Sequence, residues 1–454
     1  MKKINMQLTN IKVTRNPFLL FLPPLMFYII FIFILSNNAL WGDEYIYVGY
    51  AKNLLNGFYS EPAPKISLSD GPGYSLFIMP FMALKLPLIV IRLLNALLLY
   101  LSVIVLCKVL IKFVPYNMAL LFSFFWACYY NFLDFIALIC SETLSIFLIS
   151  ILLFLLTKAF APGMRIKNNK YLFFSGFVIG YLVLTKIIFG YVLLCMLIGS
   201  GLLVIINRNA INYQKGIIIL FVALTTSSPY LLYTYHLTGK IYYLGSSGGN
   251  NLYWMSTPYE YEYGSWFPSP NIKSDSMAFE KRVKSFEKGS LLNLKNRSSY
   301  IPGYEDSLKS HHQKDFEEIL KFSEPARDDA YKKIAVANII AYPVKFIKNC
   351  FSNIGRILFN YPYSYTLQKS GTLIRFPLNG IIIVLILFCT IPTIINWKKI
   401  IFPLRFMLFF SFIYLGGSIF GSAEFRMFTI IVPVLLFWIA FIIHRCVKIN
   451  ITKW

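Results

Sequence analysis

Apolar runs long enough to cross a lipid bilayer recur along the whole of this 454-residue chain. A spanning helix needs roughly 20 mostly apolar residues, and about ten runs come near that length: Pro17–Ser36, Leu88–Ile111, Asn117–Leu133, Glu142–Thr157, Tyr171–Thr185, Ile188–Ile206, Gly216–Tyr235, Phe376–Ile395, Ile401–Phe420 and Met427–Ile443. Hydrophobic residues make up 57% of the sequence and charged residues 14%, more apolar surface than a soluble chain could bury. Because lipid leaves backbone polar groups no outside partner, the runs predict an all-α polytopic membrane protein.

The positive charge of the chain is concentrated in short loops. Lys158–Lys170, Asn207–Lys215 and Asn396–Lys399 are short and basic, as are the N-terminal segment and the C-terminal tail. Such loops stay in the cytoplasm, so we expect both termini there, with a retained first span rather than a cleaved signal peptide. The net charge of +23 then belongs to cytoplasmic loops and anionic headgroups, and a nucleic-acid partner is not expected.

Two long segments fall on the opposite, extracytoplasmic face. Residues 39–87 form the first outer loop, and residues 236–375 are long enough for a small folded unit. Within that unit Ile334–Phe359 has helical apolar spacing interrupted by basic residues, which favours an interfacial helix over another span. The expected division is a transmembrane catalytic module (1–235), the outer unit (236–375) and C-terminal spans with a cytoplasmic tail (376–454).

A group of charged residues near the ends of the spans is expected on this outer face. Taking a charge out of water costs a few kcal/mol, so each such residue needs a partner or a function. Cations can neutralise a phosphate, and a carboxylate can accept a proton from an attacking hydroxyl. The candidate residues are Asp43, Glu44, Arg92, Glu142, Lys186, Glu424 and Arg426.

Each candidate also has a purely structural interpretation. Asp43 could cap an interfacial helix whose apolar stripe is Tyr47, Tyr50, Ala51, Leu54 and Leu55, with Gly57 closing it. Glu142 could be a capping residue in the stretch SETL. Arg92 and Lys186 could extend to lipid headgroups, and Glu424 could pair only with Arg426.

No metal or nucleotide motif is evident. His311–His312 lies in the polar stretch SHHQKDFEE without a third ligand at metal-site spacing, which predicts a solvated helix face. His236 is read as a lone interfacial histidine, and the seven cysteines show no ligand or disulfide pattern. Gly245–Asn251 is glycine-rich but lacks the GK[ST] ending of a P-loop.

Several segments, in order, resemble the glycosyltransferase C superfamily, in the branch of the protein O-mannosyltransferases and the lipid A aminoarabinose transferases. They cover most of Trp41 to Pro433: WGDEYIYVGYAKNLLNG, DGPGYSLFIMPF, IRLLNALL, SETL, GFVIGYLVLTK, SSPYLLYTYHLTGKIYYLGSSGGNNLY and AEFRMFTIIVP. Met427 and Phe428 stand where the family often has Tyr, and Ser75 replaces a frequent proline. Members of this family use polyprenyl-phosphate-linked sugars as donors.

The resemblance implies a role for each matching residue. Asp43 takes the position of the catalytic carboxylate and Glu142 that of the second acidic residue. Lys186, Arg426 and Arg92 would stabilise the phosphate leaving group. Glu44, Glu424 and Tyr74 complete the expected substrate-binding set. Some relatives bind a divalent cation and others do not, and two carboxylates are too few to predict a metal.

These observations favour an integral-membrane glycosyltransferase with its active site on the outer face. It would move a sugar from a polyprenyl phosphate to a lipid, glycan or protein acceptor, in a bacterial inner membrane. One alternative is an O-antigen ligase or polymerase, although such proteins usually place key residues in a late outer loop. Another is a transporter or flippase, which predicts charges or broken helices near the midplane and a pseudo-repeat.

Overall fold

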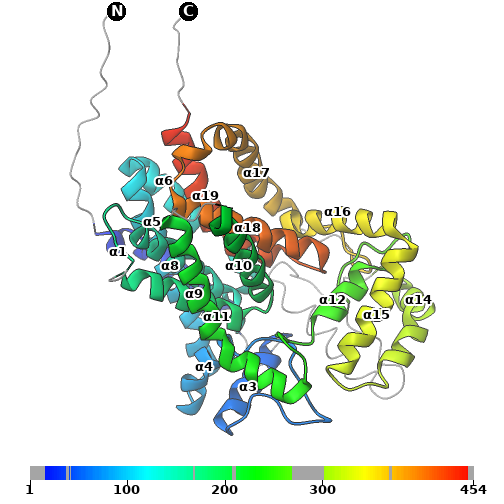
Figure 1. Ribbon diagram of the computed structural model, residues 1–454. Helices are drawn as coiled ribbons and strands as arrows, with labels where there is room; N and C mark the ends of the chain where they lie inside the picture. Colours follow the sequence, from blue (N-terminus) through cyan, green and yellow to red (C-terminus); the bar gives the residue numbers. More distant parts are fainter. Residues whose placement is uncertain are drawn as a thin grey trace, which may run out of the picture.

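The structure is a computed structural model, and it describes residues 16–36, 40, 42–166, 169–206, 211–267, 301–367 and 371–447. Every regular element in these ranges is a helix (Figure 1). The prediction of an all-α polytopic membrane protein is confirmed. Eight helices are long and apolar enough to cross a bilayer, and two expected spans fall on the shorter apolar helices Leu22–Leu35 and Lys170–Thr185.

Each of the ten predicted spans coincides with a helix. The helices are α2 (Leu22–Leu35), α5 (Leu88–Phe113), α6 (Tyr116–Ala127, continued by α7, Leu133–Ile136), α8 (Glu142–Ala159), α9 (Lys170–Thr185), α10 (Ile188–Ile206), α11 (Ile211–Thr238), α17 (Gly371–Ile395), α18 (Phe402–Phe420) and α19 (Phe425–Arg445). A short helix, α1 (Pro17–Leu20), precedes them. In the most apolar window of each helix, 83% of α19 and 72% of α8 is buried, against 22% of α17. The helices α8 and α19 therefore form the centre of the bundle.

Small residues bring two of the spans unusually close. An added Cβ at Gly176 of α9 would lie 2.5 Å from the carbonyl oxygen of Ile219 in α11, and one at Gly180 would lie 2.5 Å from the Thr226 Cβ. These glycines, four residues apart, form the small-residue face that lets two membrane helices pack backbone to backbone. The close packing fixes α9, whose C-terminal end is followed directly by Lys186.

The first outer loop contains the helices α3 (Glu44–Leu55) and α4 (Gly73–Ala83). Its predicted apolar stripe is largely confirmed, because Tyr47, Tyr50 and Ala51 are buried, whereas Leu55 is 44% exposed. Gly57 follows with a φ of +88°, a conformation that suits glycine after a helix.

The outer unit has a small hydrophobic cluster of its own. Its helices are α12 (Gly248–Met255), α14 (Tyr304–Ile319), α15 (Ala326–Ala341) and α16 (Pro343–Phe359). Aromatic residues such as Trp254 and Phe316 fill the cluster among α12, α14 and α15. Figure 1 shows these three helices beside the bundle, in the lower half of the view with α3 and α4.

One prediction for the outer unit is wrong. Ile334–Phe359 is not a single helix, because the chain bends by 110° between α15 and α16. Pro343 explains the break, since proline disfavours helical geometry in the preceding residue and is well tolerated in the first turn of a new helix, where it stands in α16. The helix α16 is amphipathic: it exposes Val344, Ile347 and Phe351 and buries Asn349, Asn353 and Arg356.

Candidate functional site

Arg426 lies at the centre of the candidate site. It stands in the first turn of α19, where its guanidinium contacts three carboxylates. Its Nη1 lies 3.0 Å from Asp43 Oδ2 and 3.3 Å from Glu142 Oε1, and its Nε lies 3.0 Å from Glu424 Oε2. Asp43 and Arg426 are 383 residues apart in the sequence. The interpretation that Glu424 and Arg426 pair only with each other is therefore wrong.

Lys186 and Glu142 form the second ion pair of the site. The chain leaves α9 at Lys186 and enters α8 at Glu142, and Lys186 Nζ donates to Glu142 Oε1 at 2.9 Å. Glu142 is 2% exposed, and its Oε2 accepts no hydrogen bond from an N–H or O–H group in the part of the chain described. The thiol of Cys140 is beside that carboxylate. A buried carboxylate oxygen without a strong donor is suited to accept a hydrogen bond from a bound hydroxyl.

Asp43 does not cap α3 with its side chain. The residue precedes the helix in helical geometry and makes no side-chain capping hydrogen bond. Its carboxylate instead reaches Arg426 and remains 39% exposed. Asp43 therefore occupies the N-cap position of α3 that the local sequence predicts, but the prediction that its side chain caps the helix is wrong.

Glu44 and Arg92 lie inside the protein and face each other. Arg92 Nη2 donates to Glu44 Oε1 at 3.1 Å, and the side chains are 2% and 1% exposed. Glu44 Oε1 also accepts from the backbone N–H of Ile139 at 2.7 Å. One turn along α5, Asn95 donates to the carbonyls of Ile136 and Leu138. These contacts fasten the 136–139 segment that leads into Glu142, so the geometry favours a positioning role for Glu44 and Arg92; that they bind substrate stays a prediction.

Asp70 belongs to the same charge group but was not among the sequence candidates. Its carboxylate lies near Asp43, Lys186 and Glu142, and Tyr47 donates to it at 3.4 Å. Although it keeps some exposed surface, protein surrounds it on most sides. Burial, followed by the charge of Asp43, raises the pKa of Asp70 to about 6, against the smaller opposing effect of Lys186. The motif DGPG carries the signal that could have identified it.

The glycines of that motif bring Asp70 to the end of α9. A Cβ added at Gly71 would lie 2.2 Å from the carbonyl oxygen of Leu184, and one at Gly73 would lie 2.7 Å from the Thr185 nitrogen. Only residues without a side chain permit this approach of two backbones. The contact sets Asp70 beside Lys186, which directly follows Thr185.

Tyr74 lies beneath the charge group rather than at its surface. Its ring packs edge-on against Tyr47 with centroids 5.0 Å apart, and the residue is fully buried. Its hydroxyl has no hydrogen-bond partner in the described chain, an arrangement that costs about 1–3 kcal/mol unless a water or ligand satisfies it. Substrate binding by Tyr74 stays a prediction.

The histidine pair of the outer unit differs from its prediction. His312 is buried, not solvated, and Glu262, 49 and 50 residues earlier in the chain, supplies the third ligand-type side chain that the local sequence lacks. Glu262, His311 and His312 form a group that could hold a metal ion. No local signal could have linked Glu262 to the pair.

Comparisons with known proteins show a similar fold but no close relative. Neither the family models nor the curated proteins contain a match. Over 93% of the chain, the fold is similar to Archaeoglobus fulgidus oligosaccharyltransferase AglB, solved with an inhibitory peptide and a dolichol-phosphate (12% identity, TM-score 0.47, 50% of that chain). It is also similar, over 93% of the chain, to ArnT from Cupriavidus metallidurans bound to undecaprenyl phosphate (10% identity, TM-score 0.37, 77% of that chain).

Both solved proteins belong to the glycosyltransferase C superfamily, which the sequence motifs also resemble. The chain spans about half the length of the oligosaccharyltransferase it matches. The proposed function therefore rests on this chain's own residues.

Proposed function

We propose that the chain is an integral-membrane glycosyltransferase that uses a polyprenyl-phosphate-linked sugar as donor. The main support is that the guanidinium of Arg426 contacts three carboxylates, those of Asp43, Glu142 and Glu424. Glu142, Glu424 and Arg426 lie at the ends of spans. Carboxylates and cations so arranged can activate an acceptor and neutralise a phosphate together. The motif resemblance supports the same reaction.

In the proposed reaction Asp43 orients the acceptor hydroxyl or amine and accepts its proton. The acceptor atom attacks the anomeric carbon, and the bond from that carbon to the phosphate oxygen breaks with inversion. Its electron pair leaves with the polyprenyl phosphate, whose growing charge is stabilised by Lys186 and Arg426. Glu142 Oε2, which accepts no N–H or O–H hydrogen bond within the described chain, would accept one from the sugar or the acceptor.

The charge balance of the site supports a role for a divalent cation. Four carboxylates (Asp43, Asp70, Glu142 and Glu424) gather around two cations, Lys186 and Arg426. An anionic donor entering a site with excess negative charge would be repelled. We therefore propose that Mg²⁺ or Mn²⁺ enters with the donor phosphate, since both ions prefer oxygen ligands.

The position of the charges favours an enzyme over a transporter. Glu142 is the first residue of α8, Lys186 directly follows α9 and Arg426 lies in the first turn of α19. A flippase would instead be expected to place such groups near the midplane. An O-antigen ligase or polymerase remains the second candidate within glycan enzymes, and its diphosphate-linked oligosaccharide donor distinguishes it.

We also propose the topology and domain division expected from the sequence. Both termini and the short basic loops would lie in the cytoplasm of a bacterial cell, and the site would face outward across the inner membrane. The boundaries at 235 and 375 lie three residues before the end of α11 and four residues after the start of α17. Labelling of single cysteines placed at Lys398 and at exposed Glu61 with an impermeant reagent tests the orientation, and labelling of both from the same side would contradict it.

The central experiment incubates purified protein with a panel of polyprenyl-phosphate sugars and follows release of the carrier phosphate. We expect turnover with at least one donor and a loss of about 100-fold or more in Asp43→Asn, the scale of one positioned general base. Glu61→Gln is the matched control, because this carboxylate lies in the same outer loop and is 50% exposed. Turnover in Asp43→Asn equal to that of the control would overturn the proposed mechanism, and release only from diphosphate-linked donors would favour the ligase.

A further inference from the structure

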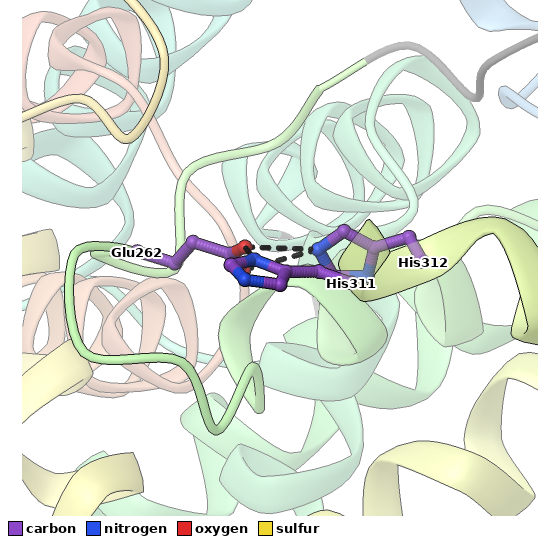
Figure 2. A group of neighbouring side chains, drawn as sticks. All are labelled: Glu262, His311 and His312. Atoms are coloured by element: carbon purple, nitrogen blue, oxygen red, sulfur yellow. Dashed lines mark hydrogen bonds and ion pairs between the residues drawn. The ribbon is translucent and has the colours of Figure 1, made fainter. Parts of the chain in front are cut away.

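Glu262, His311 and His312 meet in the outer unit, away from the residues of the proposed reaction. Glu262 lies in the segment after α12, and both histidines belong to α14. Figure 2 shows the carboxylate facing both imidazole rings. His311 Nδ1 lies 2.7 Å from Glu262 Oε1, and His312 Nε2 lies 3.1 Å from Oε2. Side chains of neighbouring residues on a helix point in different directions. The two histidines nevertheless reach one carboxylate because His311 uses Nδ1 and His312 uses Nε2.

The hydrogen bonds of Tyr253 with His312 and Asp315 determine the tautomer of His312. The Tyr253 hydroxyl lies 2.8 Å from Asp315 Oδ2 and 2.6 Å from His312 Nδ1. An ionised carboxylate can only accept, so the tyrosine hydrogen goes to Asp315, and His312 Nδ1 must donate to the tyrosine oxygen. In the neutral imidazole this leaves the lone pair of Nε2 directed at the oxygens of Glu262.

Two acceptors that face each other at hydrogen-bond distance need a positive species between them. That species is either an additional proton on the ring or a metal ion. A ligand histidine whose other nitrogen is held by a hydrogen bond is the usual arrangement around protein-bound metals. The Glu262 carboxylate is held in a similar way, because it accepts hydrogen bonds from the hydroxyls of Thr257 and Tyr365.

The geometry of the three ligands fits a small tetrahedral ion. One ligand atom from each side chain lies within 4.8 Å of the others. Metal–ligand bonds of 2.0–2.2 Å place ligand atoms about 3.4 Å apart in a tetrahedron, so modest side-chain shifts suffice. The ring of His311 is held by stacking on Tyr259, with centroids 3.7 Å apart. Its side chain is 34% exposed, which gives an ion a path and leaves space for a water as fourth ligand.

We propose that Glu262, His311 and His312 bind one Zn²⁺ ion that fastens α14 to the segment Tyr259–Phe267. Two imidazole nitrogens and a carboxylate oxygen are a ligand set typical of zinc. The segment in turn reaches the bundle, since the Trp266 N–H donates to Ser422 Oγ at 2.6 Å, two residues before Glu424. An ion bound there would link α14, through this segment, to the start of α19.

The test uses the full chain in detergent, purified with a tag that contains no histidine. After treatment with a chelator and dialysis against ZnCl₂, followed by gel filtration, we expect one Zn²⁺ per chain by elemental analysis. Zn²⁺ at about 100 times its Kd should raise the Tm by at least a few degrees. His312→Gln and Glu262→Gln should lose the ion, whereas His236→Gln, which removes an exposed histidine outside the group, should keep it.

His311→Gln changes a half-exposed side chain, so it distinguishes lost binding from failed folding. If His312→Gln does not fold, His311→Gln should still lower the Zn²⁺ content by at least 10-fold. Co²⁺ added to the wild type should give the visible absorption of a tetrahedral nitrogen and oxygen site. Equal Zn²⁺ content in the wild type and His311→Gln, or no bound Zn²⁺ in a folded wild type, would show a protonated hydrogen-bonded cluster and overturn the proposal.

Discussion

Removal of Arg92 tests whether the buried Glu44–Arg92 pair holds the site in place. Arg92→Met leaves the Glu44 carboxylate, 1% exposed, without its cation at 3.1 Å. Breaking a buried ion pair on one side costs about 3–5 kcal/mol, because the remaining charge is desolvated and uncompensated. The methionine fills much of the arginine volume, so little of the loss comes from a cavity.

The double variant Glu44→Gln/Arg92→Met isolates the charge effect. The glutamine carbonyl oxygen can still accept from the Ile139 N–H, which lies 2.7 Å from Glu44 Oε1. With no charge left buried, we expect roughly half or more of the lost stability to return, as replaced buried pairs are often close to neutral.

The assay is thermal unfolding in detergent, read together with donor turnover. Arg92→Met should lower the Tm by about 3–5 °C, because 1 kcal/mol corresponds to about 1 °C for a chain of 454 residues. It should also reduce kcat with little change in KM, since Glu142 is displaced rather than a substrate contact removed. Lys65→Met, which breaks the exposed pair with Glu61 at 3.8 Å, is the control and should leave the Tm unchanged. A Tm within 2 °C of the wild type for Arg92→Met, or a double variant no more stable than the single one, would refute the reasoning.

Three further predictions concern Asp70, its loop and a cation. The pKa of Asp70 is raised from 3.8 to about 6 in the folded protein, so the folded state binds this proton more tightly than the unfolded state. The wild type therefore loses stability as pH rises from about 4 to 6. Asp70→Asn should be more stable than the wild type above pH 6, by up to about 3 kcal/mol, and equally stable below pH 4. Unfolding at pH 4 and pH 7 measures this, and an equal difference at both values would contradict it. Gly71→Ala places a Cβ 2.2 Å from the Leu184 carbonyl oxygen and should reduce turnover at least 10-fold. The control Gly49→Ala, with nothing within 4 Å of the new Cβ, should keep the turnover of the wild type. Equal activity of the two variants would refute the close approach of the two backbones. Chelation should lower turnover at least 10-fold, and Mn²⁺ or Mg²⁺ should restore it. Full turnover after chelation would show that Lys186 and Arg426 alone balance the donor charge and would overturn the cation role.

The spans and many residues of the candidate site could be predicted from the sequence for one physical reason. Lipid requires long apolar helices and makes a charge near the end of a span costly, so both features are visible in local composition. Asp43, Glu142, Lys186, Glu424 and Arg426 were singled out in this way, and they lie together in the structure.

Which charges pair with which could not be predicted from composition. Glu44 and Asp43 are neighbours in the chain, yet one side chain turns inward to Arg92 and the other outward to Arg426. That difference depends on where the start of α3 meets Arg92 of α5 and Arg426 of α19, which the local sequence does not encode. Asp70 was not predicted as a site residue, because its loop reaches Lys186 only through the packing of Gly71 and Gly73 on the end of α9.

By itself the sequence determined the helical class, the approximate spans and a set of costly charges near the ends of spans, because hydropathy acts over short stretches of chain. Only the tertiary structure decided that Arg426 contacts three carboxylates and that Arg92 is buried in an ion pair with Glu44. It also decided that Glu262 lies beside a histidine pair about 50 residues away in the chain. These contacts join residues far apart in the chain, so they exist only once the helices have packed.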